Sequence, residues 1–171
     1  MKNSVFPYII MLLLPSIGYA QEQPLLIYQN GKLGYINSNG NILIEPRYLN
    51  AGKFNNGLAP VRENGCFGYI DTKGNWIIKP KYDYAMPFSY GMAIVYKDGK
   101  PFYINKKGLS VIKDSFTMAF PFEYSRALVT YAENKWTLID KNGNSILGDT
   151  YEYIVEIKPG YYQITQNKSD D

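Results

Sequence analysis

The chain repeats itself with a period of 34 residues. Gly31, Gly65 and Gly99 are spaced by this period. Three further columns follow it: Tyr35, Tyr69 and Tyr103; Gly40, Gly74 and Gly108; and Phe54, Phe88 and Phe122. A fixed period of this length indicates one supersecondary unit copied in tandem. Because a recurring residue is explained by packing before chemistry, the period predicts architecture better than activity.

Each unit is predicted to be a three-stranded antiparallel meander. In the clearest copy the strands are residues 58–62, 67–71 and 75–79. Glycines in the intervening turns supply the positive φ that tight hairpins need. Pro80 lacks an N–H group and is expected to end the last pairing, and Pro60 predicts an edge position for the first strand.

Apolar columns predict which strand faces are buried. Two adjacent columns on the third strand are apolar: Leu43, Ile77, Val111 and Ile146, and then Ile44, Ile78, Ile112 and Leu147. Because adjacent strand positions point to opposite faces, both faces of this strand are expected to be covered. Small alanines in the first strand (Ala59, Ala93, Ala127) predict the close approach of a neighbouring unit.

Residues 1–20 are predicted to be a secretory signal peptide. Lys2 precedes a largely apolar run over residues 5–14, and Gly18 to Ala20 resemble a cleavage site. A membrane anchor is the alternative, although the run is about half the length of a bilayer span. The mature chain would begin at Gln21 and be extracytoplasmic, either periplasmic or secreted, with no membrane span.

The rest of the chain is predicted to form a single β domain over residues 21–165, with a polar tail at 166–171. Its repeats are expected at 30–63, 64–97, 98–133 and 134–165. We expect the units to stack as a twisted, solenoid-like array. A small four-bladed β-propeller is the alternative, because the first and last apolar runs are the same type of strand.

Composition excludes several functions. The chain has no histidine, which removes the Ser-His-Asp and Cys-His relays and the commonest zinc ligand. Its single cysteine, Cys66, cannot form an intrachain disulfide, whereas an intermolecular one stays open. The 18 Lys and Arg against 15 Asp and Glu are dispersed, which argues against a nucleic-acid partner. No glycine-rich phosphate loop is present, and no cofactor is expected.

Residues 64–71, with Lys73-Gly74 and the segments 77–83 and 91–95, resemble the WG-repeat family. The resemblance covers about residues 30–165. The signature Trp-Gly pair itself is absent: its two columns hold Leu33-Gly34, Phe67-Gly68, Pro101-Phe102 and Trp136-Thr137. The third and fourth copies also lose the Pro-x-Tyr corner of the first two, Pro46 to Tyr48 and Pro80 to Tyr82. The resemblance implies an all-β repeat scaffold that binds a partner and has no catalytic motif.

An Asx residue ends the second strand of every unit, three positions before its glycine. The column consists of Asn37, Asp71, Asn105 and Asp140. The sequence 140–144 has oxygen ligands at alternate positions, as a calcium loop does, but no glutamate closes it. Asn and Asp interchange freely in this column, which favours a side-chain oxygen that caps the hairpin turn. No metal site is therefore expected.

An enzyme is the alternative to a binding protein. A glycoside hydrolase needs two carboxyls roughly 5 to 10 Å apart. Acids outside the repeat pattern could supply them: Glu45, Asp83, Asp98, Glu123, Glu152 and Glu156. Scattered surface charge is the simpler interpretation, so we expect the chain not to be an enzyme.

Aromatic residues outside the conserved columns give the better indication of function. Trp76, Tyr84, Tyr90, Tyr96 and Tyr124 share columns with polar residues, so these positions tolerate water. An exposed aromatic residue is typical of contacts with a protein or a sugar ring. We therefore predict a scaffold that binds a protein partner or a cell-envelope glycan through these five side chains.

Overall fold

The computed structural model describes residues 23–112 and 114–166 of the 171-residue chain. The predicted signal peptide lies outside the described residues, as does the predicted tail except for Gln166. The described residues form fifteen strands: β1 Leu25–Gln29, β2 Lys32–Ile36, β3 Ile42–Tyr48, β4 Asn50–Ala51, β5 Leu58–Glu63, β6 Cys66–Asp71, β7 Trp76–Tyr82, β8 Tyr84–Ala85, β9 Met92–Lys97, β10 Lys100–Asn105, β11 Met118–Ala119, β12 Arg126–Thr130, β13 Trp136–Asp140, β14 Tyr153–Lys158 and β15 Tyr161–Thr165. No helix that could cross a membrane occurs in the described ranges.

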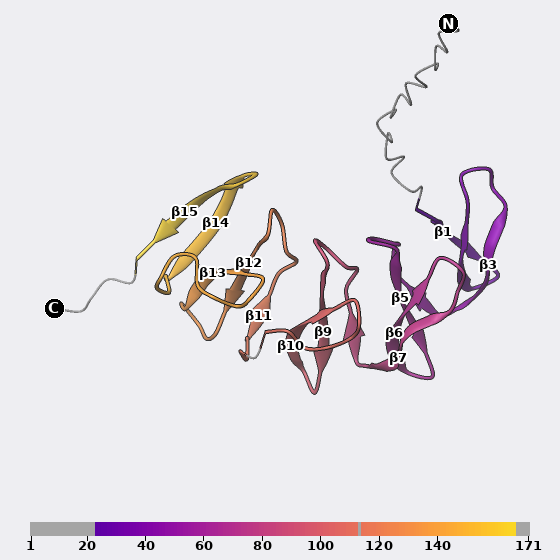
Figure 1. Cartoon of the computed structure of the whole chain (residues 1–171), viewed down its shortest axis with the longest axis horizontal. Helices are drawn as coiled ribbons and strands as arrows, with labels where there is room; N and C mark the ends of the chain where they lie inside the picture. Colours follow the sequence, from indigo (N-terminus) through magenta and orange to yellow (C-terminus); the bar gives the residue numbers. More distant parts are fainter. Residues whose placement is uncertain (1–22, 113, 167–171) are drawn as a thin grey trace, which may run out of the picture.

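The strands form five small antiparallel sheets. Sheet 1 is β1-β2-β3, sheet 2 is β4-β5-β6-β7, sheet 3 is β8-β9-β10, sheet 4 is β11-β12-β13 and sheet 5 is β14-β15. The sheets follow one another in a curved row, with β1 of sheet 1 near one end and β15 of sheet 5 near the other (Figure 1). Sheets 1 and 5 lie at opposite ends of this row and do not pack on one another, so the array does not close into a propeller (Figure 1). The predicted all-β, solenoid-like array of repeats is confirmed.

Neighbouring sheets bury their apolar faces against one another. Three cores lie between successive sheets: the first joins sheets 1 and 2, the second joins sheets 2 and 3, and the third joins sheets 3 and 4. Each core contains one edge-to-face pair of the recurring tyrosine and phenylalanine, with ring centroids 4.6 Å apart for Tyr35–Phe54, 4.8 Å for Tyr69–Phe88 and 5.0 Å for Tyr103–Phe122. The periodic residues are therefore the packing residues, because each unit covers the next.

Buried tyrosine hydroxyls tie each sheet to the segment that follows it. The hydroxyl of Tyr35 donates to the carbonyl of Gly52 (2.8 Å), that of Tyr69 to Met86 (2.7 Å) and that of Tyr103 to Phe120 (2.7 Å). Desolvation by burial raises the pKa of all three phenols. The same column in the fourth repeat holds Leu138, which has no hydroxyl.

A glycine permits the third strand to cross the second at close range. A Cβ at Gly68 would lie 2.4 Å from the carbonyl oxygen of Ile78 and 2.7 Å from the nitrogen of Pro80. Gly34 and Pro46 have the same relation in sheet 1, with the added Cβ 2.6 Å from the proline nitrogen. In the later repeats both partners are replaced, by Phe102 with Asp114 and by Thr137 with Asp149. There the third strand is reduced to the isolated bridges Ile104↔Ser110, Ile139↔Ser145 and Trp136↔Tyr151.

The Asx column caps the hairpin turns, as predicted. One side-chain oxygen accepts two backbone N–H groups in each copy: Asn37 from Asn39 and Asn41, Asp71 from Lys73 and Asn75, Asn105 from Lys107 and Leu109, and Asp140 from Asn142 and Asn144. These bonds lie between 2.8 and 3.1 Å. Both Asn and Asp provide the accepting oxygen, which explains their interchange.

Three predictions about strand details are wrong. Pairing does not end at Pro80, because β7 bulges and continues until Tyr82 pairs with Phe67. Pro60 is not at an edge, because β5 lies between β4 and β6 and the Pro60 carbonyl accepts the Gly52 N–H (2.8 Å). The third strand is covered on one face alone, because Ile44, Ile78 and Ile112 are buried but the adjacent column of Leu43, Ile77, Val111 and Ile146 is 37–52% exposed. In sheets 1 and 2 this strand, β3 or β7, is the edge strand of its sheet.

Candidate functional site

The five predicted contact residues do not form one surface. Tyr84 and Tyr96 are cross-strand partners between β8 and β9, with ring centroids 5.9 Å apart. Tyr90 lies at the other end of β9 and pairs with Tyr124, at a centroid distance of 6.2 Å. Trp76 is half-buried and packs against the first core. The structure thus divides the set into two pairs and one largely structural tryptophan.

The first pair joins Tyr84 and Tyr96 to the core. Phe67 makes an edge contact with Tyr84 at 5.5 Å, and Tyr96 is half-buried against the third core. Tyr84 remains about half exposed. Much of this aromatic surface therefore contributes to the stability of sheets 2 and 3.

The second pair, Tyr90 and Tyr124, projects from equivalent turns of adjacent repeats. Their side chains are 47% and 57% exposed. The Nζ of Lys141 lies 6.0 Å from the ring centroid of Tyr90, and the guanidinium carbon of Arg126 lies 5.9 Å from that of Tyr124. We call these four residues the tyrosine-pair patch. It combines exposed aromatic rings with cations at distances suited to cation–π attraction.

Both tyrosines have a left-handed backbone. Their φ angles are 49° for Tyr90 and 45° for Tyr124. The equivalent residue of the previous repeat is Asn56, with φ of 52°, and its side-chain oxygen accepts the N–H of Gly91 (2.9 Å). Asn suits this conformation, whereas a bulky side chain is strained in it. The patch therefore carries tyrosine where the fold favours asparagine.

Sequence reasoning missed the cations of this patch. Arg126 occupies the same column as the buried Leu58 and Met92, so a charge in an otherwise apolar column was the available signal. Its guanidinium also lies 5.3 Å from the ring centroid of Tyr162, and its Nε donates to the Tyr162 hydroxyl (3.3 Å). Arg126 thus contacts two tyrosines, Tyr124 in the turn before β12 and Tyr162 in β15.

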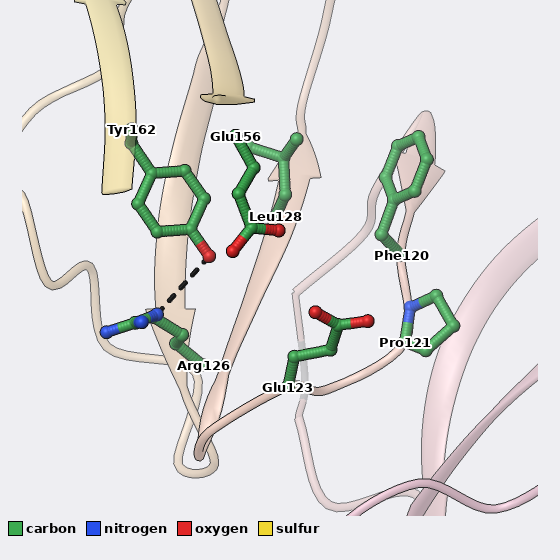
Figure 2. Close-up of a pocket in the computed structure, with 7 residues that line it drawn as sticks. All are labelled: Phe120, Pro121, Glu123, Arg126, Leu128, Glu156 and Tyr162. Carbon is green, nitrogen blue, oxygen red and sulfur yellow. Dashed lines mark hydrogen bonds between the residues drawn. The ribbon is translucent and has the colours of Figure 1, made fainter. Parts of the chain in front are cut away.

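A pocket of about 220 Å³ lies beside this arginine, between sheets 4 and 5. Its lining consists of Phe120, Pro121, Glu123, Arg126, Leu128, Glu156 and Tyr162 (Figure 2). Glu123 and Glu156 belong to the acids that could serve a glycosidase, and the structure brings them to one pocket. Both glutamates are exposed, and one carboxylate oxygen of Glu156 already accepts the N–H of Gly160 (2.7 Å).

The other candidate acids lie elsewhere. Glu45, Asp83, Asp98 and Glu152 are exposed and do not line this pocket. A carboxylate oxygen of Asp83 accepts the N–H of Asp98 (2.7 Å), which is a turn-stabilising contact. Cys66 is half-buried and unpaired within the described chain, and that part of the chain contains no cluster of three potential metal ligands.

Comparison with known families identifies the repeat. The family model described as WG containing repeat matches residues 34–65 and 67–100, which confirms the resemblance to that family. No curated protein sequence matches the chain. One similar solved structure is the crystal structure of the computationally designed Ika8 protein, with 12% sequence identity and a TM-score of 0.44. The similarity covers 83% of this chain and 57% of that one.

Proposed function

We propose that this chain, in which residues 34–65 and 67–100 are WG containing repeats, is a non-catalytic scaffold that binds a protein partner. We further propose that it acts outside the cytoplasm, because residues 1–20 read as a cleavable signal. A cell-envelope glycan is the other class of partner and is an outcome of the experiment below.

The observation that carries the proposal is the conformation of Tyr90 and Tyr124. A left-handed backbone costs a non-glycine residue about 1–2 kcal/mol, and short polar side chains bear that cost best. Strained residues persist where function requires their side chains. Two adjacent repeats keep an exposed tyrosine at this position, although Asn56 shows that the fold accepts a better-suited residue there.

The chemistry of the tyrosine-pair patch favours a protein over a glycan. Tyrosine and arginine are enriched among the residues that dominate protein–protein binding energy. Lys141 and Arg126 lie near the rings of Tyr90 and Tyr124 and supply positive charge. An acidic protein surface would meet both the rings and the cations, whereas a neutral sugar would use the rings alone.

The test is the double substitution of Tyr90 and Tyr124 by asparagine. We expect capture of a partner from envelope extract to be lost, while the free energy of unfolding stays equal or rises by up to about 1 kcal/mol. The rise has two sources: relief of backbone strain, and a new cross-repeat hydrogen bond like the one that the Gly91 N–H donates to the side-chain oxygen of Asn56. Capture followed by mass spectrometry, together with urea unfolding, measures both effects.

Tyr28→Asn is the matched control, because Tyr28 is 74% exposed on sheet 1, away from the patch. Its capture should equal that of the native chain. Tyr84→Asn tests the other aromatic pair, Tyr84 and Tyr96. Asparagine is chosen because Asn50 occupies the equivalent position in the first repeat. If the double variant captures the partner as well as the native chain does, the tyrosine-pair patch is not the binding surface. If the native chain captures glycan and no protein, the partner is a glycan.

A glycoside hydrolase remains the second candidate, because Glu123 and Glu156 line one pocket. Hydrolysis needs one carboxyl kept protonated, which an apolar environment provides. Here both side chains are exposed, and Glu156 is engaged by the turn at Gly160. We therefore expect no release of sugar from envelope glycans. Turnover by the native chain that Glu123→Gln abolishes would establish the enzyme instead.

A further inference from the structure

Among the residues that the structure describes, the outer face of sheet 1 lacks the cover that sheets 2, 3 and 4 receive. Strand pairing places Leu25 opposite Ile36, and Ile27 opposite Gly34, on one face. The same register recurs in sheet 2, where Ala59 pairs with Ile70 and Val61 with Gly68. We call Leu25, Ile27 and Ile36 the outer triad.

The equivalents of the outer triad are fully buried in the three following sheets. They are Ala59, Val61 and Ile70; Ala93, Val95 and Ile104; and Ala127, Val129 and Ile139. Their side chains are 0–2% exposed, because the preceding sheet covers them. In sheet 1, Leu25 is 54% exposed and Ile27 and Ile36 are only half-buried. No described strand precedes this sheet.

The other end of the array has a different character. On sheet 5, Ile154 is buried toward sheet 4, and the opposite face carries Tyr153, Gln163 and Thr165 with one aliphatic side chain, the half-buried Val155. Polar outer faces are typical of the terminal repeats that keep a stack soluble. Sheet 5 therefore resembles a cap, whereas sheet 1 presents the apolar chemistry of an internal repeat.

We infer that the outer triad is a self-association surface, where sheet 1 of one chain packs face to face on sheet 1 of a second copy. The surface continues the sheet-on-sheet packing of the array, whose cores use these same columns. A two-fold axis brings two apolar triads together and closes the assembly at two chains. Head-to-tail stacking would instead place the outer triad of one chain on Gln163 and Thr165 of sheet 5 in the next chain. Such an assembly would not close and would grow into a filament.

The backbone beside the outer triad is arranged as in the covered sheets. The third strand crosses Gly34, opposite Ile27, at the same close range at which it crosses Gly68, opposite Val61, within the array. Sheet 1 has three strands, of which the longest has seven residues. An interface of this width is small for a permanent dimer, so we expect dissociation on the order of micromolar concentration.

Sedimentation velocity of the purified chain over a range of concentrations tests the inference. We expect the mass to rise from one chain to two and no further. Leu25→Lys places two like charges at the interface and should weaken the dimer at least about tenfold. Leu49→Lys is the matched control, because Leu49 is 79% exposed and lies outside the triad, and it should dimerise like the native chain.

A native chain that stays monomeric at every concentration overturns the inference, whatever the variants do. Growth into longer assemblies also overturns it, in favour of head-to-tail stacking. Amide exchange adds a readout that does not depend on a substitution: dimerisation should slow exchange in β1 and β2 and leave β14 and β15 unchanged. Because the tyrosine-pair patch is not on sheet 1, failure here leaves the proposed partner binding intact.

Discussion

At the scale of single residues, three buried tyrosines link successive repeats through their hydroxyl groups. Tyr35, Tyr69 and Tyr103 are completely buried, and each donates to a carbonyl 17 residues further along the chain. A buried polar group is stable when its partner is present and costly when the partner is removed. The tyrosine column is therefore conserved within this chain for both its ring and its hydroxyl.

Tyr69→Phe should lower the free energy of unfolding by about 1–3 kcal/mol, because the Met86 carbonyl loses its buried donor. Urea unfolding measures this change. Burial raises the pKa of the Tyr69 phenol, so the folded state retains its proton in alkali. Its contribution to stability is present below the ordinary phenol pKa near 10 and is lost as the pH rises above it. The variant should therefore lose less stability between neutral pH and strong alkali than the native chain.

Gly68→Ala should destabilise the chain by about 1–3 kcal/mol or more, because the new Cβ would lie 2.4 Å from the Ile78 carbonyl oxygen. Gly65→Asn is the control, since Gly65 has a φ of 88° and open space around it, and Asn tolerates this conformation. Thermal unfolding compares the two. Equal melting temperatures for Gly68→Ala and the native chain would show that the third strand can move away without cost.

At the scale of elements, the hairpin turn and the third strand behave differently among the repeats. The Asx cap occurs in all four copies with the same pair of backbone donors. The third strand is regular only in sheets 1 and 2, where glycine and proline occur together. The turn is thus preserved by hydrogen bonds within five consecutive residues. The third strand depends instead on a close approach to the glycine of the second strand.

The turns capped by Asp71 and Asp140 should make the free energy of unfolding fall at acidic pH. At Asp71 desolvation is the largest single influence and raises the carboxyl pKa, but the hydrogen bonds from Asn75 and Lys73 together outweigh it, so the pKa is lowered. At Asp140 the Asn144 backbone N–H is the main cause of a lowered pKa. A lowered folded-state pKa gives stability that is present above the unfolded value near 3.8 and is lost as the pH falls through the folded value.

The double variant Asp71→Asn and Asp140→Asn should therefore lose less stability on acidification than the native chain. Asn37 and Asn105 make the same turns, so the fold should be retained at neutral pH. Urea midpoints measured from neutral to acidic pH provide the comparison. Glu133→Gln, an exposed change outside these turns, is the control and should follow the native curve.

For the whole molecule, stability should be lowest at the C-terminal end. Sheet 5 has two strands, and Leu138 cannot donate the hydroxyl bond that joins the earlier repeats. Ile154 and the contacts of Tyr162 with Arg126 are among the interactions that hold this hairpin to sheet 4. In a stacked array each unit is stabilised mainly by its neighbours, so an end unit with one neighbour opens first.

Hydrogen exchange should show this gradient directly. We expect the amides of β14 and β15 to exchange faster than those of β5 and β6, which lie inside a four-stranded sheet between two cores. The comparison is made within one sample and requires no variant. Equal protection at the two places would mean that the array unfolds as a single cooperative unit.

The period, the Asx turns and the inward tyrosine and phenylalanine columns could all be read from the sequence, because each depends on residues close together in the chain or on repetition itself. The exposure of Leu43 and Ile77 could not, since an apolar pair of columns does not reveal which face of the strand a neighbouring sheet covers. Nor could the course of β7 beyond Pro80, because a bulge that relies on Gly68 restores the pairing.

The candidate site was found only in part for the same reason. Tyrosines at water-tolerant positions were visible in the sequence, but Tyr90 and Tyr84 share one repeat and lie at opposite ends of β9. The pairing of Tyr90 with Tyr124, the nearby cations and the pocket around Glu123 and Glu156 join different repeats. The sequence by itself determined a stack of β units and their internal contacts, because repetition encodes local packing. The tertiary structure alone decided which irregular side chains meet, because that depends on how far each unit turns relative to the one before it.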